Sequence, residues 1–284
     1  MVAAASGATL TAAASGATLP GAPLTEATLI AAEGVALRYP TGRLALDGAS
    51  LAVAPGELVV ILGANGCGKS TLLRCIAGML RPTAGRVLVA GREIGTLAGD
   101  ALRDARLDLG MVFQAAHLVR RRSVLANVMA GTLGRHRTLA SALGVLPRCE
   151  RDHAMTCLSS VGLEQFAPQR AGTLSGGQAQ RASVARALAQ RPRALLADEP
   201  VASLDPEAAE ELMRLLRRLA HADGLAVLCV LHQPDLARRY ADRLVGLHGG
   251  RVRFDAQPGR VGEGEVAALY EAVPAHVPVE AAAA

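Results

Sequence analysis

The stretch Gly63-Ala64-Asn65-Gly66-Cys67-Gly68-Lys69-Ser70-Thr71 follows an apolar run at residues 58–62 and opens an amphipathic segment at residues 71–80. This order predicts a strand, a glycine-rich loop and a helix. Small residues in such a loop let successive backbone N–H groups surround a phosphate, and the helix N-terminus adds partial positive charge. Lys69 would then reach the β- and γ-phosphates of a nucleotide, and Ser70 would hold Mg²⁺.

Lys69 is the only lysine in a chain that has 30 lysine and arginine residues in total. Lysine carries a narrow point charge, whereas the broad guanidinium fork of arginine would crowd a loop that encloses a triphosphate. The use of lysine here and arginine everywhere else favours a phosphate-binding loop over a glycine-rich turn with an incidental lysine.

The composition is that of a globular protein. With 284 residues, 51% of them hydrophobic, the chain can bury the core of one large domain, or of a domain with a subdomain. No apolar run approaches the roughly 18 residues that cross a bilayer, and the N-terminus lacks the pattern of a secretory signal. We therefore expect a cytoplasmic protein that would act on a membrane only through a partner.

The charge and the cysteines narrow the choice of partners and metals. The net charge is +5, but the arginines are dispersed and aromatic residues make up only 2%, too few for a base-stacking surface, so we expect no nucleic-acid partner. The one dense basic run, residues 120–122, is either a solvated surface or a contact with a partner or anionic lipid headgroups. The five cysteines form no C-x-x-C pair and have no zinc-like spacing to histidine, so we expect buried, apolar thiols.

The order of apolar patterns along the chain predicts an α/β fold. Residues 3–10 recur at 12–19, and we expect a disordered, low-complexity segment there. Strands are expected at residues 29–37, 49–53, 57–62, 86–90, 107–113, 193–197, 226–231, 244–247 and 251–254. Helices are expected at residues 71–80, 179–190, 206–221, 235–241 and 264–272, with a helical insert at 123–163. The alternation of strands and helices predicts a mainly parallel sheet covered by helices.

The second half of the chain adds chemistry to the expected ligand edge of this sheet. Asp198 and Glu199 follow the strand at 193–197, so Asp198 can face Mg²⁺ while Glu199 polarises a water as general base. His232 follows the strand at 226–231 and is the histidine best placed to contact a γ-phosphate. The other six, at positions 117, 136, 153, 221, 248 and 276, are expected at the surface or at helix ends.

Two helix N-termini and one tyrosine complete the candidate residues. A helix begins at Ser175-Gly176-Gly177-Gln178. As in the glycine-rich loop at 63–71, exposed backbone N–H groups and the helix N-terminus predict an anion site here. Asp205 precedes Pro206 and is expected to be an N-cap. Tyr39 either closes the edge of the core or stacks on a base, and the sequence leaves both open.

Together, Tyr39, the phosphate loop, Gln114, the Leu174–Gln178 pentapeptide, Asp198-Glu199, Ser203–Asp205 and His232 resemble the nucleotide-binding subunit of ATP-binding-cassette (ABC) transporters. The resemblance implies a P-loop NTPase (RecA-like) core with an antiparallel β subdomain and a helical signature subdomain. The resemblance covers residues 28–258, and the helical subdomain within it lies at about 115–185. A low-complexity segment at 1–27 precedes this domain, and a tail at 259–284 follows it.

The resemblance assigns roles to individual residues. It implies ATP and Mg²⁺ as ligands, with Mg²⁺ held by Ser70, Gln114 and Asp198 and catalysis by Glu199, His232, Gln114 and Lys69. The nucleotide would be bound by Tyr39, Gly63, Ala64, Asn65, Gly66, Cys67, Gly68, Lys69, Ser70, Thr71, Ser175, Gly176, Gly177, Gln178 and Asp205. The Leu174–Gln178 pentapeptide is the signature of the family, and its residues Ser175, Gly176, Gly177 and Gln178 would serve the opposite subunit of a homodimer.

Within that family, residues 197–206, 231–233, 127–135 and 169–170 are similar to the ATPase of phosphonate importers. The chain departs from that pattern at Gln233-Pro234, at Cys67 and in its repetitive N-terminus. This similarity implies membrane permease partners, an indirect link to a solute-binding protein, and a peripheral position on the cytoplasmic face of the inner membrane. The alternatives are another solute importer, a lipoprotein-release or export system, and a non-transport ABC protein that acts on DNA or ribosomes.

Overall fold

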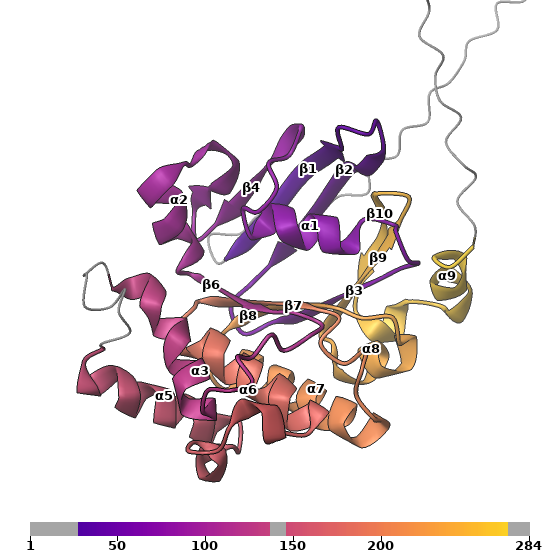
Figure 1. Cartoon of the computed structure of the whole chain (residues 1–284). Helices are drawn as coiled ribbons and strands as arrows, with labels where there is room; N and C mark the ends of the chain where they lie inside the picture. The colour runs from indigo at the N-terminus through magenta and orange to yellow at the C-terminus, as the bar shows by residue number, and fades with distance from the viewer. Residues whose placement is uncertain (1–27, 137–145, 272–284) are drawn as a thin grey trace, which may run out of the picture.

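Two β-sheets and the helices around them form residues 28–136 and 146–271, the parts of the chain that this computed structural model describes (Figure 1). The duplicated segment at 3–19, residues 137–145 of the expected helical insert, and His276 lie outside the described residues.

The larger sheet has six strands in the order β10-β9-β3-β8-β7-β6. Its strands are β3 (Leu58–Leu62), β6 (Leu109–Val112), β7 (Ala194–Asp198), β8 (Ala226–Val230), β9 (Arg243–His248) and β10 (Arg251–Ala256). All neighbouring pairs are parallel except β9 and β10. Val60 and Ile61 of β3 point into different apolar clusters on the two faces, as strand alternation requires. The mainly parallel, two-sided sheet expected from the sequence is confirmed.

The second sheet is antiparallel and has the order β2-β1-β4-β5. Its strands are β1 (Ile30–Arg38), β2 (Leu44–Val53), β4 (Ala84–Val89) and β5 (Arg92–Glu93). Helix α1 (Lys69–Ile76) lies between the two sheets, and its apolar side joins the cluster that both sheets share (Figure 1).

Most of the remaining helices cover the opposite face of the six-stranded sheet. Figure 1 shows α3, α5, α6 and α7 on that side, away from α1. The helices are α2 (Gly99–Arg106), α3 (Val124–Met129), α5 (Arg148–Ser160), α6 (Gly176–Ala189), α7 (Pro206–His221), α8 (Pro234–Tyr240) and α9 (Glu263–Ala268). Short 3₁₀ turns are η1 (Ile94–Thr96), η2 (Ala130–Arg135), η3 (Glu164–Phe166), η4 (Ala171–Thr173) and η5 (Pro258–Arg260). Within the described residues, no helix combines the length and the apolar character that crossing a bilayer would need.

Several element boundaries differ from those expected. Helix α1 ends at Ile76 and not at residue 80, because Gly78 takes a left-handed φ of 67°. Helix α6 begins at Gly176 and not at residue 179, because Ser175 caps it. Helix α2 was not expected at all, since it is short and mostly polar and Ala105 is its only buried residue.

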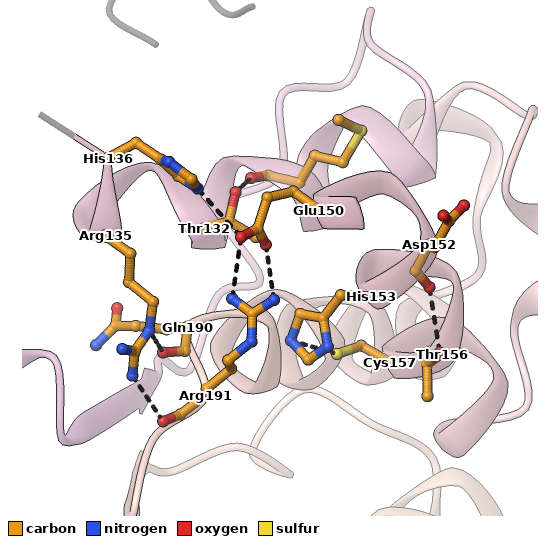
Figure 2. A network of polar contacts seen from close by, with 11 residues as sticks. Thr132, Arg135, His136, Glu150, Asp152, His153, Thr156, Cys157, Gln190 and Arg191 are labelled. Carbon is orange, nitrogen blue, oxygen red and sulfur yellow. Dashed lines mark hydrogen bonds and ion pairs between the residues drawn. The ribbon is translucent and has the colours of Figure 1, made fainter. Parts of the chain in front are cut away.

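A polar network ties α5 to the turn between α6 and β7 (Figure 2). The Glu150 side chain is buried, and its carboxylate accepts hydrogen bonds from His136 Nε2 (3.1 Å) and Arg191 Nη1 (3.2 Å). Burial raises the pKa of Glu150, but the hydrogen bonds from Arg191 and His136 outweigh it, so the pKa lies below its ordinary value. Arg135 donates to the backbone carbonyls of Gln190 and Arg191 beside it, at 2.6 and 3.0 Å.

The same region corrects two expectations. His153 lies inside α5, half-buried, with its ring 3.6 Å from the Cys157 sulfur, so it is neither a surface nor a helix-end residue. Cys149 is exposed in the first turn of α5, whereas Cys67, Cys75, Cys157 and Cys229 are buried as expected.

Candidate nucleotide-binding site

The glycine-rich loop joins β3 to α1 in a conformation that only glycine tolerates at two positions. Gly63 and Gly68 have φ angles of 152° and 116°. A Cβ atom at Gly63 would lie 2.1 Å from the Leu247 carbonyl oxygen, and one at Gly68 would lie 2.5 Å from that of Ala45. The loop is therefore fixed against the core on one side, which orients its backbone.

Lys69 is buried at the first position of α1, with 4% of its surface exposed. Its Nζ donates to the carbonyl oxygens of Gly63 (2.7 Å) and Ala64 (3.0 Å). Burial lowers the pKa of this amine, while Cys67, Glu199 and Asp198 oppose the shift electrostatically. The Lys69 ammonium group is thus held at the loop, where a phosphate anion would complement it.

Ser70 and Asp198 meet at the edge of the sheet, although they are 128 positions apart in sequence. The Ser70 hydroxyl donates to Asp198 Oδ1 at 2.9 Å. Burial raises the pKa of Asp198, and the hydrogen bond from Ser70 opposes that rise. A hydroxyl and a carboxylate are the hard oxygen donors that Mg²⁺ prefers, so this pair fits the cation.

Glu199 and His232 form the next pair along the same edge. His232 Nε2 donates to Glu199 Oε1 at 2.5 Å. Glu199 has a left-handed φ of 51°, and its backbone N–H donates to the Val230 carbonyl at 3.2 Å. Because β8 lies between β3 and β7, the residues that follow these three strands converge at one place.

Tyr39 follows β1, and its side chain reaches the start of α1. Its hydroxyl lies 3.2 Å from Thr71 Oγ1, and its half-buried ring packs at the edge of the cluster between the sheets. Both roles expected for Tyr39 are compatible with this position.

The signature residues lie elsewhere on the chain. Ser175 and Gln178 form a reciprocal capping box at the start of α6, with distances of 3.2 Å and 2.9 Å. Asp205 caps α7 by accepting from the Ala208 N–H at 2.9 Å, as expected. Ser175, Gly176, Gly177, Gln178 and Asp205 line one surface hollow, and no residue of the glycine-rich loop takes part in it.

Gln114 is exposed just beyond β6, and the segment around it is held by α6. Gln180 donates to the Phe113 carbonyl at 2.7 Å, and Arg186 donates to the carbonyls of Ala116 and His117, each at 2.8 Å. Neither Gln180 nor Arg186 was singled out from the sequence. Gln180 is a polar residue at a buried position of a helix, which is a usable signal, whereas the half-buried Arg186 has no such mark.

Comparison with known proteins agrees with this geometry. The family model described as ABC transporter matches residues 46–202. The phosphonates import ATP-binding protein PhnC of Frankia casuarinae is 51% identical over 243 residues, which cover 85% of this chain and 96% of that protein. The corresponding protein of Rhizobium johnstonii is 48% identical, covering 80% and 81%. The phosphite import ATP-binding protein PxtA of Stutzerimonas stutzeri is 45% identical, covering 85% and 88%.

Solved structures give the same family. CbiO1 from Clostridium perfringens, part of the ABC transporter complex cbiONQ, superposes with a TM-score of 0.75 at 31% identity, covering 85% of this chain and 93% of that one. The dimeric structure of MJ0796, a bacterial ABC transporter cassette, gives 0.71 at 34% identity, covering 81% and 98%. The chain therefore belongs to the ABC transporter family, as one of its ATP-binding, ATP-hydrolysing subunits.

Proposed function

We propose that this chain is the ATPase subunit of a phosphonate import system and that it works with Mg²⁺. The observation that carries the proposal is the convergence of Lys69, the Ser70–Asp198 pair and the Glu199–His232 pair at one edge of the sheet. The names of the PhnC relatives support the solute class.

The nucleotide lies along the glycine-rich loop in this proposal. Backbone N–H groups of residues 63–71 and the N-terminus of α1 bind the phosphates, with Lys69 supplying the positive charge. The ring of Tyr39 stacks on adenine, since its hydroxyl is already anchored at Thr71 and its ring is half-exposed beside the loop. In this proposal, residues 28–258 form the ATPase domain, and its helical subdomain lies at about 115–185.

Ser70, Asp198 and Gln114 would hold the cation. Mg²⁺ supplies charge neutralisation for the phosphates when it is bound. Glu199 then orients a water and takes its proton, and His232 fixes the position of that carboxylate through its Nε2–H.

The signature serves a second copy of the chain. Ser175–Gln178 and Asp205 line a hollow that excludes the glycine-rich loop of the same chain, so a symmetric dimer would bring each signature to the partner's nucleotide. The dimeric cassette structure among the relatives supports this arrangement.

A membrane permease docks at the groove between the sheet and the helices. This groove holds about 370 Å³ and is lined by apolar side chains such as Met79, Met111 and Phe113. Met79 is 50% exposed there, which suits an apolar helix of the permease. The subunit would sit peripherally at the cytoplasmic face of the inner membrane and be linked to a solute-binding protein only through the permease.

Phosphite import is a second candidate, because the PxtA relative is 45% identical over a similar share of the chain.

Cells that lack this chain should lose methylphosphonate uptake and regain it from a plasmid copy. Uptake of phosphite alone would select the second candidate. Unchanged uptake of both solutes would reject both and point to another ABC system.

A further inference from the structure

The segment after β10 is anchored to the core. Val261, Val266 and Leu269 are buried, with 5%, 6% and 1% of their surfaces exposed. Arg238 donates to the Val261 carbonyl at 2.9 Å. The expected C-terminal tail is therefore packed against the molecule up to the end of the described residues.

This segment crosses the ligand edge of the sheet. His248, the last residue of β9, donates from Nδ1 to the Leu269 carbonyl at 3.2 Å. The Tyr270 hydroxyl makes a long hydrogen bond of 3.4 Å to the His232 carbonyl, beyond β8. Because β9 and β8 both lie next to β3 in the sheet, residues 269–270 reach the carboxyl ends of the two strands that flank β3.

The Tyr270 side chain is suited to hold these loops. The residue is 39% exposed, and burial of its hydroxyl raises the pKa of Tyr270, so the phenol keeps its proton at neutral pH. A protonated hydroxyl can donate a hydrogen bond to a backbone carbonyl. The Tyr270 hydroxyl bonds the backbone of His232, and leaves the imidazole free to contact Glu199.

We propose that Tyr270 is a positioning residue that ties the His232 loop to the C-terminal segment, which His248 in turn anchors to the end of β9. Through this tie it sets the position from which His232 contacts Glu199. The inference rests on the proposed function of the Glu199–His232 pair and adds to it a residue from the C-terminal segment.

The test is the steady-state ATPase of the full chain carrying Tyr270→Phe, which removes only the hydroxyl. We expect kcat to fall about 3- to 10-fold, the effect of losing one hydrogen bond, while KM for ATP changes by less than about 2-fold. Tyr240→Phe is the matched control, since that hydroxyl is bonded to Glu210 on α7, and its kcat should equal that of the wild type.

A double-mutant cycle separates positioning from a general effect on the fold. With radiolabelled ATP, so that low turnover can be measured, Tyr270→Phe should have no further effect in the His232→Ala chain. An unchanged kcat in Tyr270→Phe, or an equal loss in both backgrounds, would overturn the inference. A wild-type chain without Mg²⁺-dependent ATPase activity would instead reject the proposed function.

Discussion

His232 Nε2 lies 2.5 Å from Glu199 Oε1, although the two residues follow different strands, β8 and β7. The left-handed backbone of Glu199 turns its side chain toward that histidine, and the Glu199 N–H is tied to the Val230 carbonyl. The carboxylate is therefore held by contacts from the neighbouring strand, which is the pre-organisation that a general base needs.

Glu199→Gln should keep ATP binding and lose hydrolysis. The amide preserves the shape of the side chain but cannot take a proton, whereas Lys69 and Ser70 remain in place. We expect kcat to fall by about 10²–10⁴-fold. Equilibrium nucleotide binding and steady-state turnover check this, and the variant should accumulate as an ATP-bound dimer. Near-normal turnover would remove Glu199 from the role.

The left-handed φ of 51° at Glu199 should have a cost in stability. Glycine adopts this conformation freely and alanine does not, so Glu199→Gly should be more stable than Glu199→Ala by about 1 kcal/mol after the entropy of glycine in the unfolded chain is counted. The free energy of unfolding in urea measures the difference. Equal stabilities would mean that the backbone at this position is relaxed.

Lys69→Arg should abolish ATP binding or hydrolysis, even though the charge is kept. The Lys69 side chain is 4% exposed and ends between two loop carbonyls, so a planar guanidinium does not fit there. Nucleotide titration and turnover test this together. Wild-type values for both would show that the single lysine is incidental.

The sequence predicted most reliably those helices that have both a continuous apolar stripe and an N-cap residue. Helix α7 matches its expected range of 206–221, because Asp205-Pro206 marks its start and its apolar stripe is continuous. The meeting of Ser70 with Asp198 followed from a general rule, since the carboxyl ends of parallel strands share one edge.

Contacts that depend on the tertiary path of the chain were not predictable in this way. The hydrogen bonds from Arg186 to residues 116 and 117 join segments about 70 positions apart, and nothing in the local pattern of α6 marks them. The approach of Tyr270 to His232 has the same origin, because it depends on how the C-terminal segment folds back over the sheet.

Glu150→Gln should destabilise the protein at neutral pH, by about 1–3 kcal/mol, through the loss of charged hydrogen bonds to Arg191 and His136. The pKa of Glu150 is lower in the folded chain than its ordinary value of 4.5. Its contribution is therefore complete well above that value and is lost as the pH falls through the lowered pKa.

Urea midpoints at about pH 7 and at about pH 4 test the pH dependence. The gap between wild type and Glu150→Gln should narrow at the lower pH. Glu164→Gln, on the exposed side of η3, is the control and should be neutral at both. A gap that widens on acidification would contradict the direction of the shift.

The exposed arginines at 120–122 should be needed for assembly with the permease and not for ATP hydrolysis. The backbone of this run is fixed, because the Arg120 and Arg122 carbonyls accept from the N–H groups of Gly172 and Ala171, each at 2.9 Å. These bonds tie the three arginines to the segment that directly precedes the signature in the chain, and Val119 beside them is 57% exposed. When two chains close on the nucleotide between them, a rigid charged turn can move together with the signature. It can then pass that motion to a docked partner.

Reversal of all three charges to glutamate should weaken co-purification of the permease and reduce solute uptake. The purified subunit should keep its ATPase rate within about 2-fold, because surface charges far from the nucleotide site contribute little to hydrolysis. Reversal of Arg217, Arg253 and Arg260, three exposed arginines on α7, β10 and η5, changes the net charge equally and should leave uptake intact. Unaffected uptake in the first variant would mean that the arginine run is only a solvated surface. The permease contact would then be confined to the apolar groove that Met79, Met111 and Phe113 line.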